Sequence, residues 1–274
     1  MVDTVDGAPS GPAHAARGST SAGDRVRFVL RGVGQTLITA GVVVLLFVVY
    51  EVYVTNYFAH AAQSRARTAL KKTWVDEKAD PLLPLPGQSL PSIPEGKGMA
   101  ILYIPRLGND YSFAIVQGTS DKDLAKGPGH YKGTALPGQL GNFAVAGHRV
   151  GNGEPFLNLD HLRAGDPIII QTESKWYVYK VKGQDHHSIT SADADGIPGR
   201  EVVNPGQGGR VLTAVPDHPA GTPVTERLIT LTTCHPKFTA ADRMVVYGAL
   251  SNTYKADGLT MPSAVQALYT QQES

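Results

Sequence analysis

Cysteine is nearly absent from this sequence, since Cys234 is the single one among 274 residues. A lone cysteine excludes a disulfide framework and any zinc site that needs two or more thiolates. The sequence also has almost no excess of charge of one sign, because 25 Lys and Arg residues are balanced by 24 Asp and Glu residues. Without a basic surplus to neutralise a phosphate backbone, we expect no nucleic-acid partner. No metal-ligand spacing stands out, so we expect no metal and no cofactor.

Glycine and proline are plentiful, with 30 and 19 residues, and they favour turns and short strands over a helical bundle. Strand-like runs without regular helical alternation predict a mainly all-β domain, a closed or nearly closed antiparallel barrel. Short helices are expected at 120–126 and near 156–162. The predicted strands are 99–104, 112–117, 142–146, 167–172, 176–182, 227–234 and 243–250.

Residues 32–50 form a long apolar run in which nineteen consecutive positions carry no charge. As a helix this run spans about 28 Å, close to the roughly 30 Å hydrocarbon core of a bilayer. We interpret it as a retained membrane anchor. A cleaved signal peptide is the rival interpretation, because Ala59-His60-Ala61 resembles a cleavage site, although it lies well beyond the run. Basic residues flank the run on both sides, so charge does not settle its orientation.

The composition shifts along the chain predict its organisation. The N-terminus is rich in Gly, Ala, Ser and Thr, and five prolines between 81 and 94 predict an extended, semi-rigid stalk. The expected parts are a disordered cytoplasmic tail at 1–24, a transmembrane anchor helix at 32–58, a juxtamembrane segment with the Pro-rich stalk at 59–97, a catalytic domain at 98–250 and a C-terminal tail at 251–274.

Cys234 stands at the end of the predicted strand Leu228-Ile-Thr-Leu-Thr-Thr-Cys234. Pro236 cannot donate to a ladder and ends this strand, so a loop can expose the thiol. A lone cysteine is ordinarily a small buried hydrophobe. Outside the cell, however, an unpaired thiol is open to oxidation, which favours a functional, reactive thiol here.

A nucleophilic thiol needs a base or a cation beside it, and two residues qualify by position. His148 ends the run Asn142-Phe-Ala-Val-Ala-Gly-His148 before a glycine-rich turn, so it also occupies a strand-to-loop exit. Arg243 opens an apolar strand nine positions after Cys234, and antiparallel pairing would bring the two together. A guanidinium stays cationic and can stabilise an oxyanion. Taken singly, each is equally compatible with an ordinary loop histidine and a strand-end surface arginine.

Together these residues carry a family resemblance. Thr230-Leu-Thr-Thr-Cys234 resembles the Thr-Leu-x-Thr-Cys signature of sortases, and Ala146-Gly-His148-Arg149 is similar to their histidine motif. Arg243 stands where their strand-borne arginine is expected. The stretch from Cys234-His-Pro-Lys-Phe238 into Asp242-Arg243-Met-Val-Val-Tyr-Gly248 most resembles class E sortases of high-GC Gram-positive bacteria, with class D as the nearest alternative. The resemblance covers about residues 98–250 and implies an eight-stranded sortase barrel.

The resemblance implies a transpeptidase mechanism. Cys234 as thiolate attacks the Thr–Gly bond of a C-terminal sorting signal and gives a thioester. His148 acts as general acid toward the leaving amine and as base toward the incoming one. Arg243 binds or stabilises the oxyanion. Thr232 and Thr233 are the expected substrate-binding residues, Thr233 through a backbone or hydroxyl contact.

The resemblance also implies partners and a location. The substrates are secreted proteins with Leu-Ala-x-Thr-Gly or Leu-Pro-x-Thr-Gly-like signals, and the amine acceptor is a peptidoglycan precursor of the lipid II type. We expect a single-pass protein of the plasma membrane with an extracellular catalytic domain. The segment 191–225 is long for a loop, and it either forms one wall of the peptide groove, with a short strand at 211–215, or is a surface insertion.

Two other functions stay open. An L,D-transpeptidase also uses cysteine and histidine on wall substrates, but that family places its cysteine after a Ser-His-Gly run, which Thr232-Thr233-Cys234 does not match. The other is a membrane-anchored, non-catalytic cell-surface binding module in which Cys234 is merely packed. Reactivity of the Cys234 thiol separates these functions.

Overall fold

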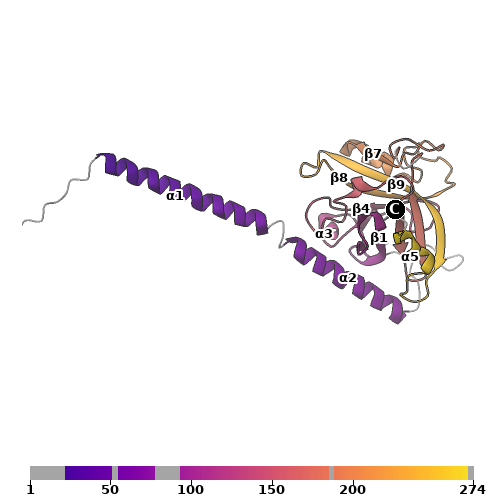
Figure 1. Ribbon diagram of the computed structural model, residues 1–274. Helices are drawn as coiled ribbons and strands as arrows, with labels where there is room; N and C mark the ends of the chain where they lie inside the picture. The colour runs from indigo at the N-terminus through magenta and orange to yellow at the C-terminus, as the bar shows by residue number, and fades with distance from the viewer. Residues whose placement is uncertain (1–21, 51–54, 78–92, 185–187, 271–274) are drawn as a thin grey trace, which may run out of the picture. The chain divides into compact units, whose positions relative to one another are not determined.

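The computed structural model describes residues 22–50, 55–77, 93–184 and 188–270 (Figure 1). The chain forms two compact units, Met1–Val49 and Tyr50–Ser274. The described part of the first unit is one helix, α1 (Ala22–Val49), and its residues 25–49 are long and apolar enough to cross a membrane. This helix begins before the anchor expected at 32–58 and ends within it. Nearly all of the predicted tail at 1–24 and most of the prolines of the stalk lie outside the described residues.

The second unit is a closed β-barrel. Eight strands follow one another around the ring in the order β6-β5-β1-β2-β3-β4-β8-β9, and β9 pairs back with β6. β7 pairs with β9 as a further strand outside the ring. The strands are β1 (Gly98–Tyr103), β2 (Ser112–Gln117), β3 (Gly129–His130), β4 (Gly141–Ala146), β5 (Pro167–Gln171), β6 (Lys175–Val181), β7 (Arg200–Val203), β8 (Arg227–His235) and β9 (Asp242–Lys255).

Short helices connect the strands or cover them. The helix expected at 120–126 is α3, which Ser120 caps by accepting a hydrogen bond from the Asp123 backbone N–H. The helix expected near 156–162 is only a 3-10 turn, η3. The helices of the second unit are α2 (Thr55–Glu77), η2 (Pro105–Leu107), α3 (Asp121–Leu124), η3 (Leu159–His161), η4 (Pro205–Gln207), α4 (Gly208–Val211) and α5 (Ser263–Thr270).

All seven predicted strands are present with bounds close to those expected, but the barrel is not wholly antiparallel. β2 pairs with β3 in parallel, and β4 pairs with β8 in parallel. Parallel strands need a long crossover, and β5, β6 and β7 with their loops provide it between β4 and β8. The parallel pairing brings the carboxyl ends of β4 and β8 to the same end of the barrel.

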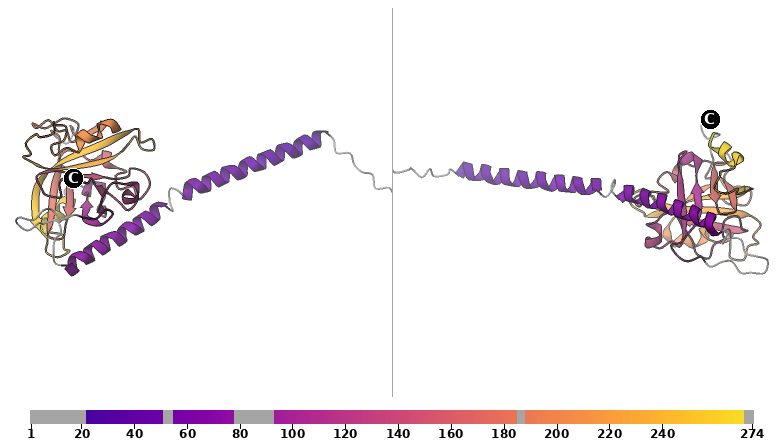
Figure 2. Two further views of the ribbon diagram at one scale, coloured as in Figure 1. Left: turned by 180° about the vertical axis from the view of Figure 1, so that it is seen from behind. Right: turned by 90° about the horizontal axis from the view of Figure 1, so that it is seen from below.

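Alternation along β1 shows how the barrel is filled inside and covered outside. Ala100 and Leu102 point into the main core, whereas Ile101 and Tyr103 point outward into a second apolar cluster. That second cluster includes Leu70 and Trp74 of α2 and Val265 of α5. Figure 2 shows α2 lying along the barrel.

The segments on either side of the expected domain 98–250 are therefore parts of the folded unit. Gln63 of α2 is buried, and its Oε1 accepts from the Ala114 N–H at 2.8 Å. At the other end, β9 runs on to Lys255 and α5 follows it, where a tail at 251–274 was expected. Sequence periodicity alone missed both because each segment buries only a few apolar side chains.

The segment 191–225 packs on the outer face of the sheet. Ile197, Val203 and Val211 form a cluster with Val245 and Tyr247 of β9. The strand predicted at 211–215 is wrong, since α4 ends at Val211 and turns follow it. Side-chain bonding explains the turn, because the Thr213 hydroxyl lies near the carbonyls of both Arg210 and Val215. The strand of this segment is β7 instead.

Candidate active site

Cys234 and Arg243 occupy opposite positions on two neighbouring strands. β8 pairs with β9 in antiparallel register, and Cys234 faces Arg243 directly. Side chains of directly opposed residues lie on the same face of a sheet. The thiol is half-buried, and the strand ends one residue later at His235. The Arg243 Nη1 donates to the carbonyls of Ala240 and Asp242, at 3.0 and 2.9 Å, which hold the guanidinium near the β8–β9 loop.

His148 follows the end of β4, at the same level of the barrel as Cys234. The last β4–β8 pair is Ala146 with Thr232, and the Gly147 N–H then donates to the Thr232 carbonyl at 3.0 Å. Continuing this register by two residues places the His148 backbone beside that of Cys234. The structure thus brings the backbones of His148, Cys234 and Arg243 to one end of three adjacent strands.

The imidazole of His148 has a free nitrogen. Among the described residues its buried Nε2 has no hydrogen-bond partner. Burial lowers the pKa of His148 below its ordinary value, and the more distant Asp121 carboxylate opposes this shift in part. The neutral ring is therefore favoured near pH 7, with one ring nitrogen able to exchange a proton.

The two threonines before Cys234 lie on opposite faces of β8. Thr232 shares the outer face with Cys234, and its Oγ1 lies 2.9 Å from the Tyr131 hydroxyl. Thr233 is buried on the inner side, and its hydroxyl donates to the Gly147 carbonyl at 2.8 Å. The Thr233 hydroxyl therefore ties β8 to β4, and the substrate contact expected of Thr233 stays a prediction.

Sequence reasoning gave no role to Arg149, which the structure places next to both loops. Its side chain is 3% exposed, and its Nη2 pairs with Asp160 Oδ1 at 3.0 Å. Its Nη1 lies 2.9 Å from His235 Nδ1 and 3.4 Å from the Cys234 carbonyl oxygen. The only available signal was that Arg149 follows His148, because burial of a charged residue cannot be read from its neighbours in sequence.

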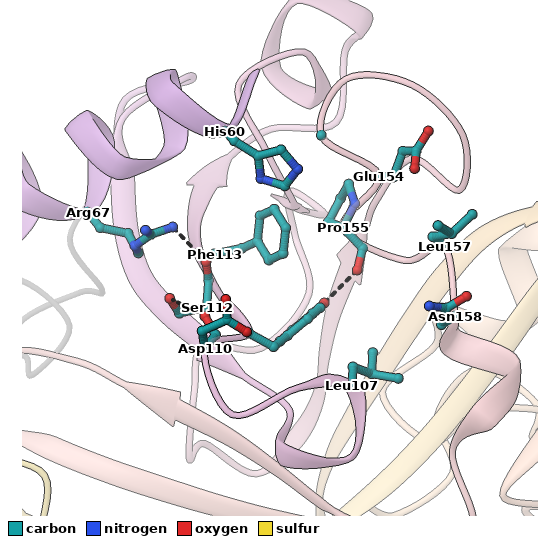
Figure 3. A pocket seen from close by; sticks show the side chains of 12 residues that line it. His60, Arg67, Leu107, Asp110, Ser112, Phe113, Glu154, Pro155, Leu157 and Asn158 are labelled. Carbon is teal, nitrogen blue, oxygen red and sulfur yellow. Dashed lines mark hydrogen bonds between the residues drawn. The ribbon is translucent and has the colours of Figure 1, made fainter. Parts of the chain in front are cut away.

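A cavity of about 340 Å³ lies behind the loop that follows His148 (Figure 3). Its lining includes His60 and Arg67 of α2 together with Asp110, Glu154 and Asn158. The Tyr111 hydroxyl donates to the Pro155 carbonyl at 2.6 Å and supports this loop. Neither His148, Cys234 nor Arg243 lines the cavity, so it is separate from the candidate active site.

Comparison with known proteins identifies the family. A model of the Sortase domain matches residues 102–251, which include the histidine, cysteine and arginine positions. Sortase SrtE1 of Streptomyces coelicolor (strain ATCC BAA-471 / A3(2) / M145) is 38% identical over 227 residues, 80% of this chain and 56% of that relative. Sortase SrtE2 of the same strain is 33% identical over 236 residues, 84% of this chain and 85% of that relative.

Solved structures agree with the sequence matches. The SrtF sortase from Corynebacterium diphtheriae is 38% identical, with a TM-score of 0.57 over 67% of this chain and 98% of that structure. This chain spans little more than half the length of SrtE1. The family match nevertheless covers more than half of this chain, and the class E relatives confirm the resemblance seen in the motifs. The chain therefore belongs to the sortase family of cysteine transpeptidases and resembles its class E members.

Proposed function

We propose that this protein is a membrane-anchored sortase that cleaves a C-terminal sorting signal between Thr and Gly and transfers the acyl group to a cell-wall precursor amine. One observation carries the proposal: the parallel β4–β8 pair and the antiparallel β8–β9 pair align His148, Cys234 and Arg243 at one barrel end. A nucleophile, a proton carrier and a fixed cation at one edge are the parts that acyl transfer through a thioester needs.

The first half-reaction forms the acyl-enzyme. Neutral His148 first takes the proton of the Cys234 thiol and becomes imidazolium. The resulting thiolate attacks the carbonyl carbon of the Thr–Gly bond, and its electron pair makes the new C–S bond. The carbonyl oxygen takes up negative charge, which the Arg243 guanidinium offsets. The C–N bond then breaks, and the departing Gly amine takes a proton from imidazolium His148. The product is a thioester on Cys234 together with a free amine.

The second half-reaction reverses the roles. The acceptor amine attacks the thioester carbonyl and gives up a proton to neutral His148. The C–S bond breaks, its electron pair stays on sulfur, and the thiolate is restored. The buried Nε2 of His148 supports this shuttle because no described side chain competes for it. Burial also lowers the pKa of His148, so the neutral base is available near pH 7.

The outer face of β8 is the proposed peptide groove. Thr232 lies on this face beside Cys234, and the segment 191–225 borders it. Asn142 of β4 fastens that segment, because its amide donates to the carbonyls of Val211 and Thr213 at 3.0 and 3.1 Å. We propose that this wall and Thr232 contact a Leu-Ala-x-Thr-Gly-like signal, with Thr233 supporting the strand from inside.

The helix α1 supports a membrane location. Its residues 25–49 can cross a bilayer, and its apolar side chains are exposed. We propose a single-pass anchor with the barrel outside the cell, where secreted proteins and a lipid II-type acceptor meet it. A sortase acts on that side, since both of its substrates are found there.

The test uses the full-length protein in detergent with a fluorescent Leu-Ala-x-Thr-Gly peptide and triglycine as the amine. We expect cleavage, a thioester adduct on Cys234 in intact-mass spectra, and a ligated product. Cys234→Ala should abolish all three, and His148→Ala should reduce turnover strongly while the barrel stays folded. Cleavage that persists in Cys234→Ala would refute the assignment of the nucleophile. A Leu-Pro-x-Thr-Gly peptide run in parallel reports the signal preference.

A further inference from the structure

We infer that Arg149 is a positioning residue for the transpeptidation step, acting by holding the loop of His148 against the loop of Cys234. The inference rests on the proposed function. Arg149 follows His148 directly, yet its guanidinium reaches across to the residues at and after Cys234. It therefore joins the two segments whose spacing the proton transfer depends on.

The contacts of the guanidinium form a three-way link. Nη1 donates to His235 Nδ1 at 2.9 Å and lies 3.4 Å from the Cys234 carbonyl oxygen. Nη2 pairs with Asp160 Oδ1 at 3.0 Å, in the turn η3 that follows the histidine loop. One planar group thus contacts the end of β8 on one side and η3 on the other.

These contacts also orient the His235 ring. An arginine N–H only donates, so the His235 Nδ1 that faces it accepts this hydrogen bond. The ring of His235, next to Cys234, is thereby held in one orientation, and its backbone is held with it.

Backbone hydrogen bonds hold the chain on both sides of Arg149. The Gly147 N–H donates to the Thr232 carbonyl at 3.0 Å, which ties the strand before His148 to β8. The His148 carbonyl accepts from the Phe156 N–H at 3.0 Å, which closes the loop on itself. Lys237 of the β8–β9 loop also approaches η3, with its Nζ 4.0 Å from Asp160 Oδ1.

Arginine suits this position better than lysine. A guanidinium offers its donors in a rigid fork, whereas an ammonium is a single point on a flexible stem. Lysine keeps the charge but cannot reach the ends of both loops at once. A misplacement of about 1 Å between reacting groups can cost on the order of a hundredfold in rate. We therefore expect the loss to fall on kcat, since the groove residues stay in place.

The experiment measures kcat and KM for peptide cleavage in Arg149→Lys and Arg149→Met. Methionine retains an apolar stem that fits the buried site, so the barrel should fold. We expect kcat to fall about 10- to 100-fold in both variants while KM changes less than about threefold. Arg106→Met is the matched control: it removes an arginine whose Nε and Nη2 each lie 3.0 Å from an Asp166 oxygen and should leave kcat unchanged.

A double-mutant cycle with His235→Ala separates positioning from plain stability. Both substitutions cut the same link, so the double variant should be about as slow as the slower single variant. Additive losses, or a kcat in Arg149→Met within twofold of wild type, would overturn the inference. A loss that disappears when the assay is cooled well below the melting temperature would overturn it as well. If wild type itself shows no Cys234-dependent cleavage, the proposed function fails instead.

Discussion

Cys234 lies directly opposite Arg243 in the β8–β9 ladder, so a sulfur and a guanidinium share one face at one end of the barrel. The ladder fixes this relationship more firmly than a loop would, because a slip of one residue would turn one of the two side chains to the other face. The loop between them has only to reverse the chain.

In the proposed mechanism, replacing Arg243 by alanine removes the cation that offsets the charge of the developing oxyanion. We expect kcat/KM to fall by about a hundredfold or more, as it does when an oxyanion donor is lost, and Arg243→Lys to retain part of the activity. Steady-state cleavage of the signal peptide measures this. The melting temperature should change little, since the bonds of Arg243 go to carbonyls of the adjoining loop.

Arg227→Ala is the control for this substitution. Arg227 begins β8, the strand that pairs with β9, far from the Cys234–Arg243 pair, and its exposed side chain donates to the Gly138 carbonyl at 3.0 Å. Its removal should leave turnover near the wild-type value. Equal activity of the Arg243 and Arg227 variants would remove the oxyanion role from Arg243.

The strands were predictable from the sequence because they depend on local signals. A short continuous apolar run marks strands such as β2, and short motifs single out Cys234 and His148 as candidates. The pairing of Cys234 with Arg243 was also foreseeable, since a short connection favours an antiparallel hairpin. These features require no knowledge of which distant strands become neighbours.

Features that depend on contacts between distant segments could not be predicted from the sequence. The parallel pairing of β4 with β8 depends on how 80 residues of crossover fold, and it brings the end of β4, just before His148, level with the end of β8 that carries Cys234. β7 has four residues, and its pattern becomes meaningful only beside β9. The burial of Arg149 likewise depends on η3 and the β8–β9 loop packing around it.

His130 should make stability depend on pH. Burial lowers the pKa of His130 to about 4, although its bond to the Ala135 carbonyl opposes the shift. Between pH 6.5 and 4, His130 is protonated in the unfolded chain but stays neutral in the native protein, so the free energy of unfolding falls as the pH falls. The difference amounts to about 3 kcal/mol by pH 4, to be measured as urea midpoints from pH 7 to pH 4.

His130→Gln isolates this contribution from the carboxylates that titrate in the same range. Glutamine keeps polar groups near Gln117 and Thr134, which His130 contacts at 2.7 and 2.9 Å, but it has no proton to gain. The free energy of unfolding of this variant should fall less steeply with acid than that of wild type. Identical slopes in the two proteins would mean that His130 does not titrate on unfolding.

Lys182 joins the two ends of the segment 191–225. Its buried Nζ lies 2.7 Å from Asp195, 3.3 Å from Asp193 and 3.6 Å from Glu226. Burial alone would lower the pKa of Lys182, but the three carboxylates together raise it, so the ammonium stays charged. The cation thus holds the start and the finish of the proposed groove wall to the end of β6.

Lys182→Met should therefore loosen the wall while the barrel stays closed. Three carboxylates left without their cation repel one another, at a cost of about 2 kcal/mol after allowance for their partial exposure. We expect limited proteolysis to cut within 191–225 at least tenfold faster and the KM for the signal peptide to rise more than kcat falls. Lys180→Met, at an exposed lysine of β6 two residues before Lys182, should change neither quantity. If the two variants are equally resistant to protease, the ion pairs of Lys182 do not hold the segment. The apolar contacts of the segment with β9 must then fix the wall.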